Sequence, residues 1–298
     1  MKRKKLALTA TWLAAHLLHL PACSQQNSPQ ELKTPLSSQD RDTLLNRHSP
    51  EAFFANCSIL PLSMAIYLND ANQIETLATD HLDLNERGSC GITLLIWSLL
   101  CRNYDCIPIL LDHGAEPSLA LTDPIEYGSA YLHDGDSFLS ASLKFLRPDL
   151  LQLSLPYSRD PTPTDRYGQN LIHTYVLSRA SEYYDNPIES TEEIISDLIS
   201  AGIDINQRSH SGHTALHHTI DHGPYLAVTL LNLGADPLIV TNDETNLPQL
   251  LEEIMTREPN RRSPKYRPLL QRLTEMNLFD PVTLQAMNVT SDDLKIRN

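Results

Sequence analysis

The sequence predicts an all-α fold built from short helix pairs that repeat along the chain. Similar apolar stretches open a short helix at Pro61–Ala65, Thr93–Ser98 and Thr214–His217. Each is followed by a second apolar stretch that ends in an apolar pair and a turn with Gly, as in Leu230–Pro237. A glycine there can adopt the left-handed conformation that ends a helix. Stacking such units would bury their apolar faces between neighbours, as in a solenoid.

The spacing of equivalent residues supports this fold. Three pairs recur at an interval of 33 residues: Ala65 and Ser98, Leu77 and Leu110, and Cys57 and Cys90. The first pair supplies a small residue on the first helix of each unit, which lets neighbouring helices approach closely. A fixed period of this length is typical of a repeat array.

At these positions the chain resembles the ankyrin family. Thr214–His217 is similar to the TPLH opening of an ankyrin repeat, and Leu110–Pro117 and Leu230–Pro237 are similar to its LLxxGAD ending. The resemblance implies an ankyrin-repeat solenoid of about six repeats, two of them degenerate. A tetratricopeptide-type array is the alternative, and the Gly-Ala-Asp turns and the 33-residue period argue against it.

The expected repeats fill residues 55–276. Their approximate bounds are 55–87, 88–120, 134–163, 165–207, 209–240 and 241–276. The third is degenerate, the fourth carries an insertion around Glu182–Glu189, and the sixth resembles an irregular terminal cap. We expect an N-terminal capping helix at residues 40–54. Residues 277–298 form a C-terminal cap or tail, in which Asp280 before Pro281 starts a last helix.

The first residues predict a bacterial lipoprotein signal at 1–22. Lys2–Lys5 is basic, and Leu6–Leu20 is an uncharged run about as long as a signal-peptide core and short for a membrane span. The run ends in Leu20-Pro21-Ala22-Cys23, which resembles the lipobox, although Pro21 replaces the usual small or hydroxylated residue. The resemblance implies cleavage before Cys23 and lipid attachment to it. An ordinary secretory signal with an incidental cysteine is the alternative.

Residues 23–39 predict a flexible tether, because they are rich in Ser, Gln and Pro. In the lipoprotein family, a residue such as Ser24 after the lipidated cysteine favours the outer membrane, so we expect an anchor in its inner leaflet, facing the periplasm. The formal net charge is −14, and loss of the four basic residues of the signal makes it about −18. This charge disfavours nucleic acid and anionic membrane surfaces and favours a basic or neutral protein partner.

In the ankyrin fold, finger turns and the inner faces of the first helices line a concave surface where partners usually bind. Several residues that the alignment places there are apolar or aromatic, and an apolar strip suggests an interface. The candidate partner-binding residues are Ile59, Tyr67, Leu68, Ile92, Leu100, Arg166, Tyr167, Gln169, His210, His213, Asp221 and His222. The alternative is that these side chains pack under the capping helix or on a long finger at 119–134.

Histidines cluster in the fifth repeat, at positions 210, 213, 217, 218 and 222. His217 stands at the histidine of the family's TPLH motif, which implies a hydrogen bond to the neighbouring finger. A zinc site would need three or four ligands that converge at about 2 Å. A pH-sensitive interface would instead use protonation near pH 6. We favour a solvated polar surface, and expect no metal or other cofactor.

The cysteines after Cys23 could pair in the oxidising periplasm. Cys101 ends one expected helix and Cys106 starts the next, so the turn could bring their Cα atoms near the disulfide distance of about 5.5–6 Å. Cys101–Cys106 is therefore the predicted pair. Catalytic motifs such as GxSxG, HExxH, CxxC and the P-loop are missing from the sequence. We therefore do not expect an enzyme.

Together these features predict a membrane-tethered protein that binds a protein partner through its concave face. A sharper hypothesis is an immunity protein that neutralises an antibacterial toxin, because repeat-containing lipoproteins counter several secreted toxins and an acidic binder suits a basic one. The alternatives are an accessory scaffold for an envelope enzyme, for example in oxidative-stress defence, and a His-based metal binder.

Overall fold

A computed structural model gives the fold of the chain. It describes residues 49–79, 81–127, 130–179, 191–257, 266–287 and 289. Every described residue belongs to one compact unit, which lies within residues 35–298. The expected signal peptide, Cys23, the tether and most of the expected capping helix at 40–54 therefore lie outside the described residues.

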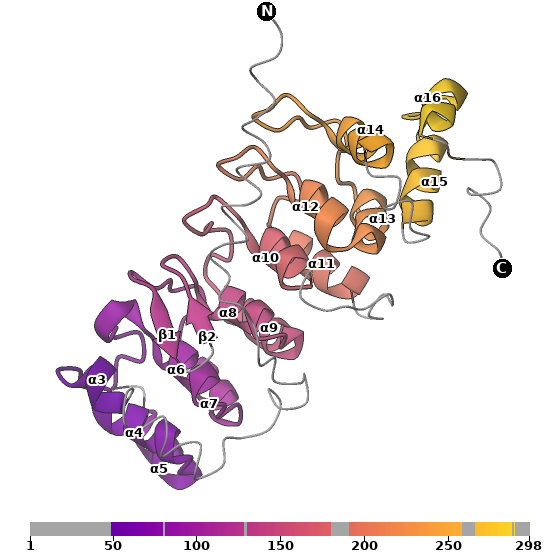
Figure 1. Ribbon diagram of the computed structural model, residues 1–298. Helices are drawn as coiled ribbons and strands as arrows, with labels where there is room; N and C mark the ends of the chain where they lie inside the picture. The colour runs from indigo at the N-terminus through magenta and orange to yellow at the C-terminus, as the bar shows by residue number, and fades with distance from the viewer. Residues whose placement is uncertain are drawn as a thin grey trace, which may run out of the picture. The chain divides into compact units, whose positions relative to one another are not determined.

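The described residues form six pairs of helices, and each pair corresponds to one expected repeat (Figure 1). The pairs are α4 (Leu60–Leu68) with α5 (Ala71–Leu77), α6 (Leu94–Leu100) with α7 (Cys106–Asp112), α8 (Phe138–Lys144) with α9 (Pro148–Ser154), α10 (Leu171–Arg179) with α11 (Thr191–Ser200), α12 (Ala215–His222) with α13 (Pro224–Asn232), and α14 (Leu247–Arg257) with α15 (Arg267–Glu275).

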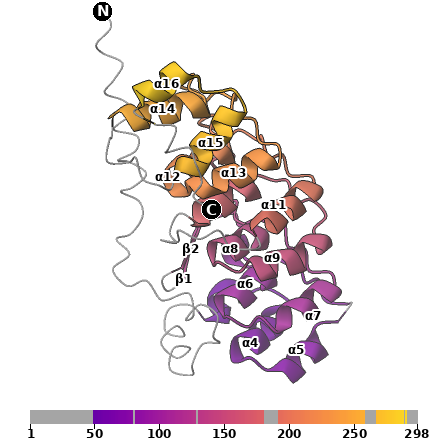
Figure 2. The same cartoon turned by 90° about the vertical axis from the view of Figure 1, so that its right-hand side faces the viewer.

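Neighbouring pairs stack on one another. First helices contact first helices, as in α4 with α6, α6 with α8, α8 with α10 and α10 with α12. Second helices contact second helices, as in α5 with α7 and α11 with α13. Figure 2 shows α5, α7, α11 and α13 following one another along one side of the stack. This arrangement confirms the predicted all-α solenoid.

The second helices α7 and α13 end at glycines in the left-handed conformation. Gly114 and Gly234 have φ of +88° and +100°. The N–H groups of Ala115 and Ala235 donate to the carbonyl oxygens of Leu110 and Leu230, both at 2.9 Å. These bonds satisfy carbonyls that the last turn of a helix leaves unpaired. The Gly turns read from the sequence thus mark the helix ends.

Short elements flank the six pairs. Helix α3 (Pro50–Phe54) precedes them, and α16 (Pro281–Ala286) follows. At the start of α16, Asp280 Oδ1 accepts a hydrogen bond from the N–H of Thr283 at 2.7 Å. The turns η2 (Ser89–Gly91) and η3 (Leu155–Tyr157) are single 3₁₀ turns. None of the helices in the described part of the chain has the length and apolar character of a membrane span.

The long finger before α8 contains a β-hairpin, which the sequence analysis had not assigned. Strands β1 (Ile125–Tyr127) and β2 (Ala130–Leu132) pair antiparallel, with Ile125 opposite Leu132 and Glu126 opposite Tyr131. Ile125 and Leu132 are buried, whereas Glu126 and Tyr131 are exposed. Because side chains alternate across a strand, one face of the hairpin is anchored in the core and the other faces solvent.

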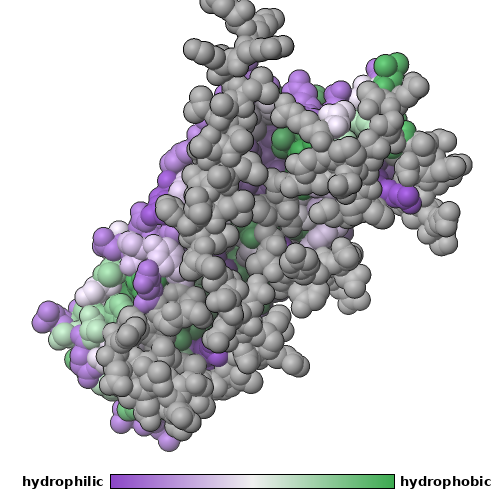
Figure 3. Space-filling view, in the orientation of Figure 1, coloured by the Kyte–Doolittle hydropathy of each residue, from purple (hydrophilic) through white to green (hydrophobic). Residues whose placement is uncertain are grey.

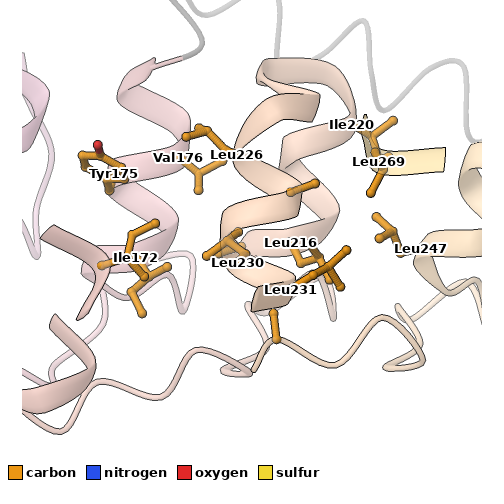
Figure 4. Packing of buried hydrophobic residues seen from close by; sticks show 14 of the residues in the cluster. Ile172, Tyr175, Val176, Leu216, Ile220, Leu226, Leu230, Leu231, Leu247 and Leu269 are labelled. Atoms are coloured by element: carbon orange, nitrogen blue, oxygen red, sulfur yellow. The ribbon is translucent and has the colours of Figure 1, made fainter. Parts of the chain in front are cut away.

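The core runs between the stacked pairs as two clusters of buried side chains. The third repeat joins them, since Phe138 packs in the N-terminal cluster and Leu139 in the C-terminal cluster. Figure 4 shows part of the C-terminal cluster, where α10, α12, α13, α14 and α15 direct apolar side chains toward one another. Each repeat therefore depends on its neighbours for burial of its apolar surface.

Asparagine side chains tie the repeats together at their turns. Asn85 Nδ2 donates to the carbonyl oxygen of Gly114 at 3.0 Å, and its Oδ1 accepts from the N–H of Glu116 at 2.8 Å. Asn206 Oδ1 accepts in the same way from the N–H of Asp236 at 2.9 Å. In each case the bonds hold the turn that follows the second helix of one repeat against a loop of the preceding repeat.

The predicted Cys101–Cys106 disulfide is not formed, because Cys57, Cys90, Cys101 and Cys106 are all thiols in the structure. The Cys106 thiol is instead directed at α6, with its Sγ 3.1 Å from Ser98 Oγ and 3.0 Å from the carbonyl oxygen of Asn103. Burial raises the pKa of Cys106 to about 12. Because Cys106 is the first residue of α7, its side chain points toward α6.

Candidate partner-binding surface

The loops that join each pair of helices to the next lie side by side as fingers, which project to the left in Figure 1. Backbone hydrogen bonds connect neighbouring fingers. The N–H of Thr122 donates to the carbonyl oxygen of Cys90 at 2.9 Å, and that of His210 donates to the carbonyl oxygen of Tyr167 at 2.8 Å. A third bond joins the N–H of Asn242 to the carbonyl oxygen of Ser211 at 3.2 Å. These bonds fix the spacing of the second finger from the third, of the fourth from the fifth, and of the fifth from the sixth.

Two buried histidines position the fingers from below. His173 Nδ1 accepts from the N–H of Asn170, and its Nε2 lies 3.2 Å from the carbonyl oxygen of His213 in the next finger. His217 Nδ1 likewise lies 3.2 Å from the backbone N of Thr214 and 2.9 Å from its Oγ1. Burial lowers the pKa of each histidine to about 4. His173 thus reaches the next finger, whereas the contacts of His217 Nδ1 are with Thr214 of its own repeat.

The histidine rings at the start of α12 contact one another by their faces and edges. His213 stacks on His218 with ring centroids 5.4 Å apart, and meets His217 edge-on at 5.7 Å. His173 lies edge-on to His218 at 5.9 Å. Within the described residues, no group of three or more His, Cys, Asp or Glu side chains is arranged to hold a metal ion.

Four of the candidate contact residues are core residues, and their assignment to an exposed face was wrong. Ile59 and Ile92 are completely buried, and Tyr67 and Leu100 are each only 4% exposed. The cause is the cover at this end of the stack, where helix α3 packs on α4 and η2. The packing alternative is therefore the correct interpretation for these four. Leu68, at the end of α4, is by contrast 57% exposed.

An aromatic cluster fills the space beneath α3. Trp97 lies at its centre, with ring centroids 5.6 Å from Phe53, 5.9 Å from Phe54 and 6.2 Å from Tyr67. The indole N–H of Trp97 donates to the carbonyl oxygen of Ser63 at 2.9 Å, which joins α6 to α4. Tyr67 therefore contributes to packing between the first two repeats.

The candidates in the fourth finger are on the surface. Arg166 is exposed, and its Nη1 lies 2.9 Å from Asp134 Oδ1 of the third finger. Its guanidinium carbon also lies 4.7 Å from the ring centroid of Tyr167, which is half-buried. The turn itself is held by Asp165, whose Oδ1 accepts from the N–H groups of Tyr167 at 2.8 Å and of Gln169 at 2.9 Å. Gln169 is half-buried in this turn.

Two residues not predicted from the sequence, Tyr131 and His133, extend this surface onto the hairpin. Tyr131 is 43% exposed, and its ring meets that of His133 edge-on with centroids 4.7 Å apart. His133 in turn lies edge-on to Tyr167 at 6.1 Å. Burial, followed by the charges of Lys144 and Arg166, lowers the pKa of His133. The available signal was the β-branched and aromatic residues Ile125, Tyr127 and Tyr131, which favour strands.

We call this group the finger cluster. It comprises Glu126, Tyr131, His133, Asp134, Arg166 and Tyr167. In the next finger, His210 is exposed and His213 is half-buried. The backbone of Asp221 and His222 belongs to α12, but their side chains lie outside what the structure describes. Figure 3 shows hydrophobic surface gathered at the lower left, over the N-terminal repeats, and hydrophilic surface along the margin of the later fingers above it.

Solved structures with the same arrangement identify the fold. An ankyrin repeat domain from Acinetobacter baumannii AYE matches 77% of this chain and 98% of its own length, with a TM-score of 0.52 and 20% sequence identity. The chain has the ankyrin-repeat fold. The ankyrin repeat protein EF0377 matches 66% of this chain and 92% of its own length, with a TM-score of 0.50 and 18% identity. At these identities the likeness concerns the fold alone.

Sequence relatives match shorter parts of the ankyrin-repeat chain. B-cell lymphoma 3 protein homolog of Mus musculus is 30% identical over 118 residues, which cover 35% of this chain. Protein PhlB of Serratia liquefaciens is 38% identical over 80 residues, which cover 27% of this chain. The matches span 25% and 33% of the lengths of these two relatives. No family model matches the chain.

The fingers form an extended surface of the kind that repeat proteins use for binding. The fingers here offer aromatic, cationic and carboxylate side chains on a rigid backbone edge. Such a surface is suited to recognising another protein.

Proposed function

We propose that this chain is a membrane-tethered ankyrin-repeat protein that captures a basic protein in the periplasm through its fingers, and that it is an immunity protein that neutralises an antibacterial toxin. The observation that carries the proposal is the finger cluster, in which Tyr131 and Arg166 are exposed and held in place by ring contacts and an ion pair. Tyrosine and arginine are the residue types that, with tryptophan, contribute most to protein interfaces.

Charge supports a basic partner. The formal net charge of the chain is −14. An acidic protein attracts basic proteins over a distance of about one Debye length, roughly 8 Å at physiological salt, and this speeds their association. The lipobox-like Leu20–Cys23 segment supports an anchor in the outer membrane, facing the periplasm. An antibacterial toxin that acts on the envelope would be met there before it reaches its target.

Site-specific photo-crosslinking in intact cells tests the partner and the surface together. A photoreactive amino acid at position 210, where His210 is exposed in the fifth finger, should capture one specific basic protein. The control is the same group at position 157, since Tyr157 is exposed on η3 beside Asp112, at the end of α7. Capture from position 157 but not from position 210 would contradict binding through the fingers.

The captured protein then decides between immunity and the alternative role. Expressed in the periplasm without this chain, a toxin should stop growth, and co-expression of the full-length chain should restore it. A captured envelope enzyme without toxicity would instead contradict the immunity role and support an accessory scaffold.

The lipid anchor is tested separately. Metabolic labelling with an alkyne-tagged fatty acid should label the wild-type chain and not Cys23→Ser. Equal labelling of both would contradict lipid attachment to Cys23.

A further inference from the structure

The β-hairpin of the third finger is an addition to the stacked helix pairs, and it is firmly held. Its inner face buries Ile125 and Leu132 in the N-terminal core. The base of the finger is closed by two backbone bonds, from the N–H of Leu121 to the carbonyl oxygen of Asp136 at 2.8 Å and from the N–H of Gly135 to that of Leu121 at 2.9 Å. The hairpin therefore presents its outer face at a fixed place.

Buried charge fixes the end of the same finger. Asp136 is 1% exposed, and both of its carboxylate oxygens lie 2.7 Å from Lys144 Nζ on α8. Asp136 Oδ2 also accepts from the N–H of His133 at 2.7 Å. Burial of an ion pair with several hydrogen bonds strongly restricts the local backbone. The His133 ring, on which Tyr131 packs, is thereby held in position.

The outer face of the hairpin carries one aromatic ring and one carboxylate. Glu126 and Tyr131 are directly opposite on β1 and β2, so their Cβ atoms are about 4.5–5.5 Å apart. Both side chains are exposed. Within the described part of the chain, no hydrogen bond or ion pair engages the Glu126 carboxylate. Arg166, the cation of the finger cluster, is bound to Asp134 and Tyr167 instead.

The pair Glu126–Tyr131 combines the two features that recognise an organic cation. The face of a tyrosine ring attracts a lysine or arginine side chain, and an adjacent carboxylate adds an ion pair. The neighbouring Asp123 is also exposed, which makes the finger more negative. We propose that Glu126 and Tyr131 form a docking site for one lysine or arginine side chain of the protein partner. This inference rests on the proposed function, because it assumes that the partner is a basic protein.

Selection of peptides from a random library on phage tests the site without knowledge of the partner. The target is the full-length chain in detergent micelles, with empty micelles used to remove background binders. Peptides enriched on the wild type should carry Lys or Arg at one fixed position. Their affinity should fall about threefold or more for each of Tyr131→Ala and Glu126→Gln, because the two interactions together contribute about 1.4 kcal/mol, which is about tenfold.

Matched variants distinguish a loss of affinity at this site from a loss of affinity through unfolding. Tyr157→Ala removes a tyrosine that is 42% exposed, nearly the same fraction as Tyr131, and should leave the affinity unchanged. Tyr131→Phe keeps the ring and should retain most of the affinity. Circular dichroism should show the same helix content for all four variants, because every changed side chain is exposed.

Each result has a definite meaning. Peptides that bind Tyr131→Ala and Glu126→Gln as tightly as the wild type would overturn the docking site. If the same peptides lose affinity for His210→Ala, the proposed finger surface would stand without it. Peptides that depend on Tyr131 but lack a common Lys or Arg would also overturn recognition of a cation. Failure to enrich any peptide above empty micelles would count against both the docking site and the proposed function.

Discussion

The imidazole Nε2 of His173 lies 3.2 Å from the carbonyl oxygen of His213, so a buried side chain of the fourth repeat holds the finger of the fifth. His217 is buried at the equivalent position of the next repeat, where its Nδ1 contacts Thr214 at the start of the same helix. Burial is the largest cause of the lowered pKa of each, about 4 in place of 6.5. The folded chain therefore keeps both rings neutral at a pH where the unfolded chain protonates them.

This relationship predicts that acid weakens the solenoid. The stability due to these rings is fully present above about pH 6.5 and is lost as the pH falls toward about 4, because only the unfolded chain then gains protons. Between pH 7 and pH 5 the free energy of unfolding should fall by about 2 kcal/mol for each of the two histidines. Urea unfolding at the two pH values measures this fall.

The variant His173→Gln tests whether the buried histidines cause this loss of stability in acid. It should show a smaller fall in the free energy of unfolding between pH 7 and pH 5, by about 2 kcal/mol. His81→Gln changes an exposed histidine outside this cluster and serves as the control. An equal fall in the wild type and His173→Gln would show that other groups cause the acid sensitivity.

Substitution by alanine should change the free energy of unfolding much more at Tyr67 than at Tyr131. Tyr67 is buried against Trp97, so Tyr67→Ala should lower the free energy of unfolding by about 3 kcal/mol. Tyr131 is exposed on the hairpin, so Tyr131→Ala should change stability by about 0.5 kcal/mol or less. Chemical unfolding followed by circular dichroism measures both. A Tyr67→Ala chain as stable as the wild type would contradict its place in the core.

The contrast between these two tyrosines shows what the sequence could predict. The 33-residue period, the Gly turns and the TPLH-like motif depend on local geometry, and they located the helix pairs of the repeats that follow the pattern. Alignment also gave the position of Tyr67 on its helix. The repeat pattern could not decide between an exposed face and packing under the capping helix, because Phe53 and Phe54 of α3, which contact Trp97 there, belong to no repeat.

The surface was harder to predict than the stack for a related reason. Arg166 and Tyr167 were found because the fourth finger follows the family pattern, whereas Tyr131 and His133 lie in a hairpin that the pattern does not contain. The predicted Cys101–Cys106 bridge used the length of a turn alone. The side-chain direction at the start of α7, where Cys106 points at Ser98, decided that outcome.

The cysteines make a prediction about redox state. Alkylation of the denatured chain without a reductant should modify Cys57, Cys90, Cys101 and Cys106, because all four are thiols in the structure. In the folded chain Cys106 should react far more slowly than Cys57, since Cys106 is buried and its pKa is raised to about 12. Peptide mass spectrometry of the labelled chain reads each site. A peptide mass for linked Cys101 and Cys106 would contradict the structure.

Gly168 and Gly234 show two different reasons why a position requires glycine, namely a positive φ and a lack of space for a Cβ atom. Both have positive φ, +74° and +100°, so alanine at either position costs about 1 kcal/mol of backbone strain. At Gly234 nothing lies within 4 Å of an added Cβ. At Gly168 that Cβ would stand 2.7 Å from the His210 ring and 3.0 Å from the His210 backbone N, which donates to the carbonyl oxygen of Tyr167.

Gly168→Ala should therefore lower the unfolding temperature more than Gly234→Ala does, because it adds a steric clash to the same strain. It should also displace the fifth finger from the fourth and weaken capture of the partner by a photoreactive amino acid at position 210, which Gly234→Ala leaves intact. Thermal unfolding and the cross-linking yields of the two variants measure these effects. Equal unfolding temperatures for Gly168→Ala and Gly234→Ala would mean that the fourth and fifth fingers can move apart at little cost. Their hydrogen-bonded spacing would then not define the surface.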